Sequence, residues 1–263
     1  NGLKMMLNNK PLYGDAIQEL YYLAGVGGQK RPTGAASKRM VSDLYKNEIK
    51  EQFQLRKKLK VLVDCGNGVA SDFAPALLEE IGADVVELYC DVDGMFPNHH
   101  PDPAEPENLQ DLINRVKSEE ADIGLAFDGD GDRLGVISNT GQIIWPDKLM
   151  MLFSKHVLNA NPGATIISDV KCSMDLAQVV QRHQGEYLMW RTGHSHIKSK
   201  MAETGALLGG EFSGHICFRD KWYGYDDALY SAARLLEILA NSDKSAHDLF
   251  SEFPTRHCTP EIK

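Results

Sequence analysis

Apolar strands and amphipathic helices alternate in the first half of this 263-residue chain. Residues 60–64, 84–90 and 122–127 are short apolar runs, a pattern typical of strands that are buried in a sheet. Residues 70–83 and 106–121 lie between them and carry apolar side chains at helical spacing. Because each predicted helix joins two predicted strands, the pattern predicts β-α-β units with mostly parallel strands and right-handed crossovers.

The same alternation returns in the second half of the chain. It predicts strands at 164–170 and 186–190, a strand–loop–strand unit at 206–218, and helices at 146–160, 173–184, 195–203 and 225–240. We therefore predict an α/β fold of tandem three-layer α/β/α domains with mixed, mostly parallel sheets.

These elements divide the chain into two predicted domains, 59–145 and 146–253, with further segments at the ends. Residues 1–34 resemble the tail of an earlier domain, with a strand, an Asn-Asn turn and a helix. Residues 35–58 are predicted to form a charged connecting helix, and residues 254–263 a linker to a further domain. Because the chain lacks an initiator methionine, we expect it to be an internal part of a longer product.

The composition narrows the class of protein and its compartment. Apolar content of 43% and charged content of 25% are ordinary for a soluble globular protein, and no run of about 18 apolar residues is present. The net charge is −9 and the basic residues are scattered, which argues against a nucleic-acid partner. The five cysteines form no CxxC pair and are odd in number, which suits reduced thiols better than a disulfide framework or a zinc site. We expect a cytoplasmic monomer that binds neither membrane nor nucleic acid.

The sequence FDGDGDR at 127–133 is the first candidate for chemistry. Asp128, Asp130 and Asp132 follow a predicted strand, and ligand-binding loops lie at the carboxyl ends of such strands. The intervening glycines permit the loop to curl and bring three carboxylates together. Repulsion between them would cost several kcal/mol, at about 4 Å separation, without a cation. All-oxygen ligation with few carboxylates suits Mg²⁺, which completes its shell with water or phosphate.

The aspartate pattern has two other interpretations, a calcium loop and an acidic solvated turn. An EF-hand that began at Asp128 would need Gly in place of Arg133 and Glu in place of Asn139, so a calcium loop is excluded. The other interpretation, an acidic turn exposed to solvent without a metal, is compatible with the sequence. Arg133 favours the metal interpretation, because a guanidinium beside a metal can bind a phosphoryl group or its sugar.

The sequence GGEFSGH at 209–215 is the second candidate. Glu211, Ser213 and His215 occupy alternate positions, which an extended loop would place on one side. A carboxylate, a hydroxyl and an imidazole without a metal-ligand spacing suggest recognition of sugar hydroxyls. The alternative is an ordinary turn between two strands that carries these polar residues by chance.

Three weaker signals lie elsewhere. His194 begins a predicted helix, where backbone N–H groups favour anions, but it could equally be a surface residue. Lys171 follows a predicted strand and could reach a phosphate, or be an ordinary surface lysine. The sequence DCGNG at 64–68 lacks both the P-loop lysine and GxGxxG, so we interpret it as a structural turn near the active edge.

Together, these segments resemble the α-D-phosphohexomutase family, most closely its bacterial phosphomannomutase/phosphoglucomutase branch. DGDGDR is similar to the metal loop of the family, and GEFSGH to its sugar-specificity loop. WRTGHSHIK (190–198) and SDVKCS (168–173) are similar to other segments of the third domain of that family. The similarity extends from residue 1 to about residue 260.

The resemblance implies a reaction and its metal centre. Family members interconvert hexose 1-phosphates and 6-phosphates, such as those of mannose and glucose, through a phosphoserine enzyme and a hexose 1,6-bisphosphate. Asp128, Asp130 and Asp132 would bind Mg²⁺, and Arg133 would contact the phosphosugar as a catalytic residue. Lys4 would be the counterpart of a lysine proposed for proton transfer.

The resemblance also implies the sugar contacts. Glu211 and Ser213 would hold sugar hydroxyls, with His215 nearby. His194 would be catalytic and, with Lys171, would line the cleft that binds the substrate.

Two family features are missing from the sequence. It contains neither the Ser-His-Asn-Pro sequence of the phosphoserine nor the fourth domain that holds the substrate phosphate. We therefore expect this segment to be inactive, or nearly so, by itself. A Mg²⁺-dependent sugar phosphatase and a non-catalytic phosphosugar-binding module are the alternative functions.

Overall fold

A five-stranded mixed sheet organises the first half of the chain in the computed structural model, which describes residues 5–8, 10–27, 34–35 and 37–256. Its strand order is β4-β3-β5-β6-β7, with bounds β3 Lys60–Asp64, β4 Asp84–Leu88, β5 Ile123–Phe127, β6 Leu134–Ser138 and β7 Ile143–Ile144. The β4-β3-β5 pairs are parallel and the β5-β6-β7 pairs antiparallel. The sheet is thus mixed, as predicted, although its last two strands were not foreseen.

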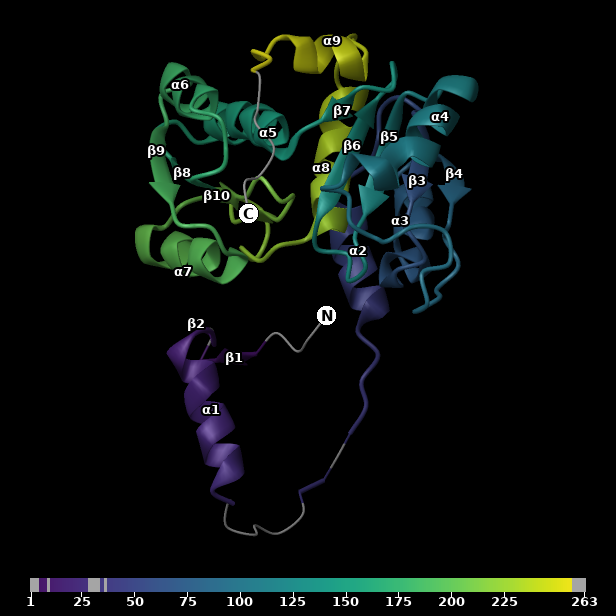
Figure 1. Ribbon diagram of the computed structural model, residues 1–263. Helices are drawn as coiled ribbons and strands as arrows, with labels where there is room; N and C mark the ends of the chain where they lie inside the picture. Colours follow the sequence, from purple (N-terminus) through teal and green to yellow (C-terminus); the bar gives the residue numbers. More distant parts are fainter. Residues whose placement is uncertain (1–4, 9, 28–33, 36, 257–263) are drawn as a thin grey trace.

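Helices cover both faces of this sheet (Figure 1). The covering elements are η1 Val69–Asp72, α3 Ala74–Glu80, η2 Pro106–Leu109 and α4 Gln110–Ser118. Successive residues of β3 point to opposite faces, so that Val61 joins the cluster of α3 and Leu62 joins that of α4. Gly124 of β5 permits α4 to pack closely, because a Cβ there would lie 2.7 Å from Val116 Cγ2.

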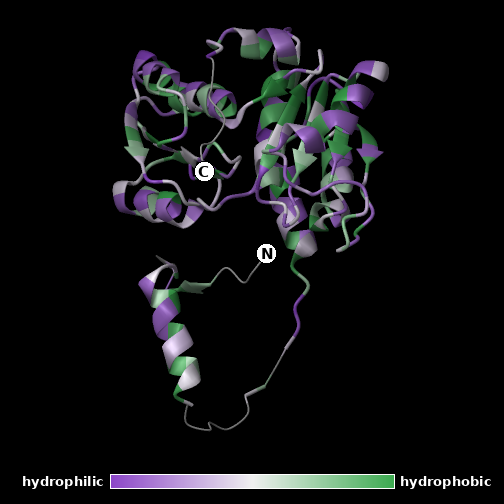
Figure 2. Ribbon diagram, viewed as in Figure 1, coloured by the Kyte–Doolittle hydropathy of each residue, from purple (hydrophilic) through white to green (hydrophobic). Residues whose placement is uncertain are grey.

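A second, four-stranded sheet organises residues 146–218. Its strand order is β11-β10-β8-β9, with bounds β8 Thr165–Asp169, β9 Glu186–Trp190, β10 Leu208–Gly210 and β11 Ile216–Phe218. The covering helices are α5 Pro146–Ala160, α6 Asp175–Arg182 and α7 His194–Thr204. Ile166 packs with the cluster of α5 and α6, whereas Ile167 packs with α7 on the other face. Figure 2 shows that the central strands of the first sheet are largely hydrophobic. The predicted α/β/α layering is confirmed.

Helix α8 (Ala228–Ala240) lies between the two sheets (Figure 1). It contacts β6 of the first sheet and β11 of the second, and most of its residues are buried. Asp227 caps its first turn by accepting a hydrogen bond from the Tyr230 N–H at 2.9 Å. Helix α9 (Ala246–Ser251) follows it. The core is therefore continuous from one sheet to the other.

The connecting helix is shorter than predicted. Residues 35–58 were expected to be helical, but α2 spans only Ser42–Gln52. Phe53 adopts extended backbone angles and is buried with its ring 5.4 Å from that of Tyr230. Packing against α8 thus ends the helix where the charge pattern alone would continue it.

The described residues before α2 include two short paired strands and a helix, where a strand, a turn and a helix were predicted. Strands β1 (Met6–Leu7) and β2 (Lys10–Pro11) pair in antiparallel fashion, and Asn8 between them has a φ of 52°. Helix α1 (Asp15–Gly25) buries none of its side chains. Tyr13 packs edge-on against His196 of α7, with the ring centroids 4.8 Å apart.

Candidate active site

The aspartate loop, residues 127–133, joins β5 to β6. Asp128 is buried, and its Oδ1 accepts hydrogen bonds from the N–H groups of Asp132 at 2.9 Å and Arg133 at 3.1 Å. The Gly131 N–H donates to the Asp128 carbonyl at 3.1 Å, and Gly131 has a φ of 75°, which favours glycine. The Asp128 carboxylate therefore folds its own loop into a tight turn.

The turn at residues 64–68 packs against the backbone of the aspartate loop. The Val69 N–H donates to the Gly129 carbonyl at 3.2 Å. A Cβ on Gly68 would lie 3.0 Å from Gly129 Cα, so only glycine permits this approach of the two backbones. The structure thus gives this turn the supporting position that the sequence suggested.

Arg133 bridges two carboxylates. Its Nε donates to Asp128 Oδ2 at 2.7 Å, and its Nη1 donates to Asp102 Oδ1 at 2.8 Å. Burial works to lower the pKa of Arg133, but Asp128 and Asp102 outweigh burial and raise it. Arg133 is 22% exposed, so a permanently charged guanidinium faces the solvent beside the aspartate loop.

The glycine-framed loop, residues 209–215, is a turn rather than the extended segment that the alternation suggested. The Gly214 N–H donates to the Glu211 carbonyl at 3.1 Å, and Gly214 has a φ of 101°. The three polar side chains nevertheless converge: His215 Nδ1 lies 2.9 Å from Ser213 Oγ and 3.3 Å from Glu211 Oε2. A reversal of the chain, not a period of two, brings them together.

Glu211 is buried and held from two sides. The Gly193 N–H donates to Oε1, and His215 faces Oε2. Burial works to raise the pKa of Glu211, but the hydrogen bonds from His215 and the Gly193 N–H outweigh it and hold the pKa below its usual range. Glu211 therefore also ties its loop to the start of α7.

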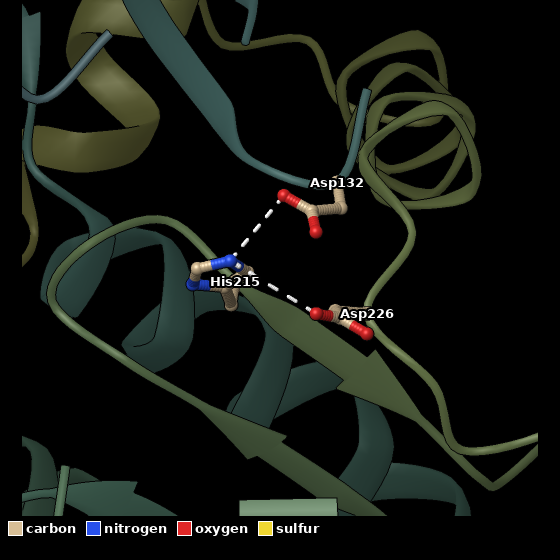
Figure 3. Close-up of side chains that lie close together, drawn as sticks. All are labelled: Asp132, His215 and Asp226. Atoms are coloured by element: carbon tan, nitrogen blue, oxygen red, sulfur yellow. Dashed lines mark ion pairs between the residues drawn. The ribbon is translucent and has the colours of Figure 1, made fainter. Parts of the chain in front are cut away.

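The aspartate loop and the glycine-framed loop meet, although they belong to different sheets. Arg133 and His215 form an isolated antiparallel bridge, and the Leu134 N–H donates to the Gly214 carbonyl at 3.3 Å. Figure 3 shows His215 between Asp132 and Asp226, with its Nε2 at 3.3 Å from Asp132 Oδ1 and 3.9 Å from Asp226 Oδ2. The imidazole is thus surrounded by acceptors from both halves of the molecule.

His194 begins α7, as predicted, and its ring stacks on that of His215 with centroids 5.1 Å apart. His194 Nδ1 lies 2.9 Å from Asp226 Oδ2, and Lys198 Nζ lies 2.7 Å from Asp226 Oδ1. Sequence analysis missed Lys198 and Asp226. Lys198 could have been found, because it lies one helical turn after His194, whereas Asp226 carries no signal apart from the helix cap that follows it.

A cleft of about 1250 Å³ opens beside these groups. Asp130, Asp132, His194 and Lys198 line its polar side, and Met6, Leu12 and Met40 contribute to an apolar side. Lys171 follows β8 and is exposed. Lys4 lies outside the described residues.

Two groups of side chains could hold a metal ion. Oxygens of Asp128, Asp130 and Asp132 lie within 4.8 Å of one another, and the same holds for ligand atoms of Asp132, His215 and Asp226. The first group offers oxygen alone and suits a hard cation, whereas the second includes an imidazole, which suits transition metals.

Comparison with known proteins decides the family. Residues 42–141 match the family model described as phosphoglucomutase/phosphomannomutase, alpha/beta/alpha domain II, and residues 145–257 match domain III of the same family. The chain belongs to the phosphoglucomutase/phosphomannomutase family. The resemblance stated from the motifs is confirmed.

Relatives of this phosphoglucomutase/phosphomannomutase chain match it along its whole length. It is 53% identical to a phosphomannomutase/phosphoglucomutase of Pseudomonas putida over 262 residues, and 50% identical to a phosphoglucomutase of Neisseria meningitidis over 264 residues. In both cases the match covers all of this chain but only 57% of the relative.

A solved structure extends the comparison to three dimensions. The crystal structure of a phosphoglucomutase/phosphomannomutase family protein from Burkholderia thailandensis superimposes with a TM-score of 0.95 at 51% identity, covering 98% of this chain and 56% of that one. The chain itself, within the residues that the structure describes, has no helix long and apolar enough to cross a bilayer.

Proposed function

We propose that this chain forms the metal-binding and sugar-binding part of a phosphohexomutase of the phosphomannomutase/phosphoglucomutase type. The reaction would interconvert hexose 1-phosphate and hexose 6-phosphate through a phosphoserine and a hexose 1,6-bisphosphate. One observation carries the proposal: the aspartate loop and the glycine-framed loop, from different sheets, meet where His215 Nε2 lies 3.3 Å from Asp132 Oδ1. A phosphorylated sugar needs a site for its phosphoryl group next to a site for its hydroxyls.

The proposed metal is Mg²⁺, held by Asp128, Asp130 and Asp132. The fit rests on their chemistry, since all three offer carboxylate oxygens that lie within 4.8 Å of one another. When bound, the metal would neutralise charge on the phosphoryl oxygens during transfer. Arg133 would bind the phosphosugar, supported by its charge and its exposure beside the loop.

The remaining roles belong to the glycine-framed loop, to His194 and to two lysines. His215 would move a proton to or from a sugar hydroxyl, because its imidazole is partly exposed between the two loops. Glu211 and Ser213 would hold the His215 ring in place, since both contact its Nδ1. Their oxygens would also accept hydrogen bonds from sugar hydroxyls. His194 and Lys171 would contact the phosphate, and Lys4 would serve in proton transfer.

The partners would be phosphates of mannose and glucose and the corresponding bisphosphate. The sequence holds no Ser-His-Asn-Pro segment, so we propose that the phosphoserine belongs to the part of the relatives that this chain does not span. The scattered basic residues and the cysteine pattern support a cytoplasmic enzyme without a nucleic-acid partner, and we propose that it works as a monomer.

Calorimetric titration of the chain with glucose 1-phosphate, in Mg²⁺ and again in EDTA, tests this proposal. We expect weak saturable binding in Mg²⁺ without release of inorganic phosphate, because further substrate contacts would come from the part of the relatives that this chain does not span. The same titration with Asp130→Asn should lose the Mg²⁺ dependence. Release of stoichiometric inorganic phosphate by the unmodified chain would instead show a phosphatase and overturn the proposal.

A further inference from the structure

Two cysteines lie together at the carboxyl ends of β3 and β4, which pair in parallel. Cys65 directly follows β3, and Cys90 lies two residues after the end of β4. The Cys65 N–H donates to the Leu88 carbonyl at 3.2 Å, and Cys90 Sγ lies 3.4 Å from the same oxygen. Cys90 Sγ is also 3.4 Å from the carbonyl oxygen of Val63. The Cys90 thiol therefore lies over the strand that leads to Cys65.

The backbone at Tyr89 turns Cys90 toward the face of Cys65. Leu88 belongs to the cluster of α4, so a regular extension of β4 would place residue 90 on that face as well. Tyr89 instead has a φ of 54°, which is strained for a residue with a Cβ. Cys90 consequently packs against the cluster of α3, of which Cys65 is a member.

The two thiols differ in access and in acidity. Cys65 is fully buried, whereas Cys90 is half-buried. The hydrogen bond between the two side chains lowers the pKa of Cys90, although burial works to raise it. The same hydrogen bond, together with burial, raises the pKa of Cys65. Because a thiolate is the form that oxidants attack, Cys90 is the thiol that should react first, with Cys65 beside it.

We propose that Cys65 and Cys90 form a reversible disulfide that disturbs the contact between their turn and the aspartate loop. The oxidant would be a hydroperoxide such as H₂O₂. The Cys90 thiolate attacks one peroxide oxygen, the O–O bond breaks, and hydroxide leaves and takes up the proton that Cys90 had lost. The Cys65 sulfur then attacks the sulfenic sulfur of Cys90, the S–O bond breaks, and water leaves with the proton of Cys65. Two thiols are thus oxidised to one disulfide, while one peroxide is reduced to two waters.

The spacing of the strands suits this bond. Paired strands lie about 4.8 Å apart, and a disulfide requires about 4.4–6.8 Å between its Cα atoms. The bond can therefore form between the ends of β3 and β4 without separating the two strands.

The main chain of Cys65 belongs to the turn that packs against the aspartate loop. Its carbonyl accepts a hydrogen bond from the Gly68 N–H at 2.7 Å. A Cβ on Gly66 would lie 3.0 Å from Pro101 Cβ, and a Cβ on Gly68 would lie 3.0 Å from Gly129 Cα, so the turn is closely packed on both sides. Because close-packed segments transmit displacements, a shift of Cys65 should move Gly129. The effect on Mg²⁺ rests on the proposed metal site, whereas the formation of the disulfide does not.

The first measurement is peptide mapping of the unmodified chain after treatment with H₂O₂. The remaining thiols are blocked with N-ethylmaleimide, and the chain is digested without reduction. We expect peptides joined through Cys65 and Cys90, which dithiothreitol separates. The matched control Cys172→Ser removes another buried thiol and should leave this link intact. If Cys90 is found blocked by maleimide, or as a sulfinic acid without a link to Cys65, the proposal is wrong.

The second measurement is a calorimetric Mg²⁺ titration of the reduced and the oxidised chain. Oxidation should weaken Mg²⁺ binding by about fivefold or more, the lower end of couplings between distinct sites, and dithiothreitol should restore it. Cys90→Ser should bind Mg²⁺ equally before and after H₂O₂. Equal affinities of the reduced and the disulfide form would contradict the coupling. An equal loss of affinity in Cys90→Ser would assign the effect to oxidation elsewhere, and would contradict it too.

The two proposals can fail separately. A reduced chain that binds no Mg²⁺ would contradict the proposed metal site, and amide hydrogen exchange would still decide the role of the cysteines. The Val69 N–H donates to the Gly129 carbonyl at 3.2 Å, so its exchange reports directly on the contact between the turn and the aspartate loop. We expect this amide to exchange about fivefold faster or more in the disulfide form than in the reduced form. Equal exchange rates in the two forms would overturn the inference.

Discussion

Asp128 and Asp130 are two residues apart in the aspartate loop, yet their loss should affect folding very differently. Asp128 is 2% exposed, and its carboxylate accepts from Arg133 Nε and from two backbone N–H groups. Asp130 is exposed. We therefore predict that Asp128→Asn destabilises the fold in the absence of metal and that Asp130→Asn does not.

The magnitude follows from the hydrogen bonds. The amide of Asn can keep its oxygen on the backbone N–H groups, but its NH₂ group then faces the donor Nε of Arg133. One hydrogen bond between charged groups is lost, which costs about 1.5–3 kcal/mol. The larger cost of an isolated buried charge should not arise, because Arg133 is 22% exposed and keeps its bond to Asp102. We expect a loss of about 2 kcal/mol.

Urea unfolding in EDTA, followed by circular dichroism, provides the assay. A loss of about 2 kcal/mol lowers the urea midpoint by about 1 M when the m value is about 2 kcal/mol per M. Asp130→Asn should stay within about 0.5 kcal/mol of the unmodified chain. Equal destabilisation by both variants would refute the view that the fold depends on the buried Asp128 more than on the exposed Asp130.

Three further predictions concern the packing, the charges and the sugar loop. Gly124→Ala should lower the free energy of unfolding by about 1–3 kcal/mol in the same urea assay, because its Cβ would lie 2.7 Å from Val116 Cγ2; an unchanged midpoint would mean that α4 can shift without cost. The hydrogen bond that His99 Nε2 donates to the Asp64 carboxylate raises the pKa of His99, so the stabilising contribution of this pair is complete below the ordinary histidine pKa and is lost as pH rises through the folded-state value. Melting temperatures from pH 6 to 9 should therefore fall more in the unmodified chain than in His99→Gln, and parallel curves would contradict this reasoning. In a chimera in which this chain replaces the matching 57% of the Pseudomonas putida relative, Glu211→Ala should weaken hexose phosphate binding by about tenfold and leave Mg²⁺ affinity nearly unchanged, whereas equal losses of both would argue against a sugar loop.

The layered fold could be predicted from the sequence because its strands are buried on both faces. Apolar runs such as 60–64 have few alternatives when predicted helical segments lie on either side, here at 35–58 and 70–83. Strands β6 and β7 were missed because they follow the aspartate loop without a helix between them. The end of α2 was missed because it depends on Phe53 packing against Tyr230, which is distant in the sequence.

The candidate site was predictable where its chemistry is local and not where it depends on contacts between sheets. The alternation of Asp and Gly residues in the sequence predicts a loop in which the carboxylates converge. Asp226 is different: it serves the cleft only because α7 brings His194 and Lys198 against it, and no spacing in the sequence expresses that contact. The turn at Gly214 was only the alternative interpretation of its segment, for a similar reason: its backbone bonds to Leu134 of the other half of the molecule.

Turnover by the chimera tests the central claim most directly, namely that this chain supplies the metal and sugar half of a phosphohexomutase. The chimera should be incubated with glucose 1-phosphate, Mg²⁺ and a trace of glucose 1,6-bisphosphate, and the 6-phosphate measured over time. We predict formation of glucose 6-phosphate that EDTA and Asp130→Asn abolish, with no net release of inorganic phosphate. A folded chimera that forms no 6-phosphate, or that releases phosphate instead, would contradict the account.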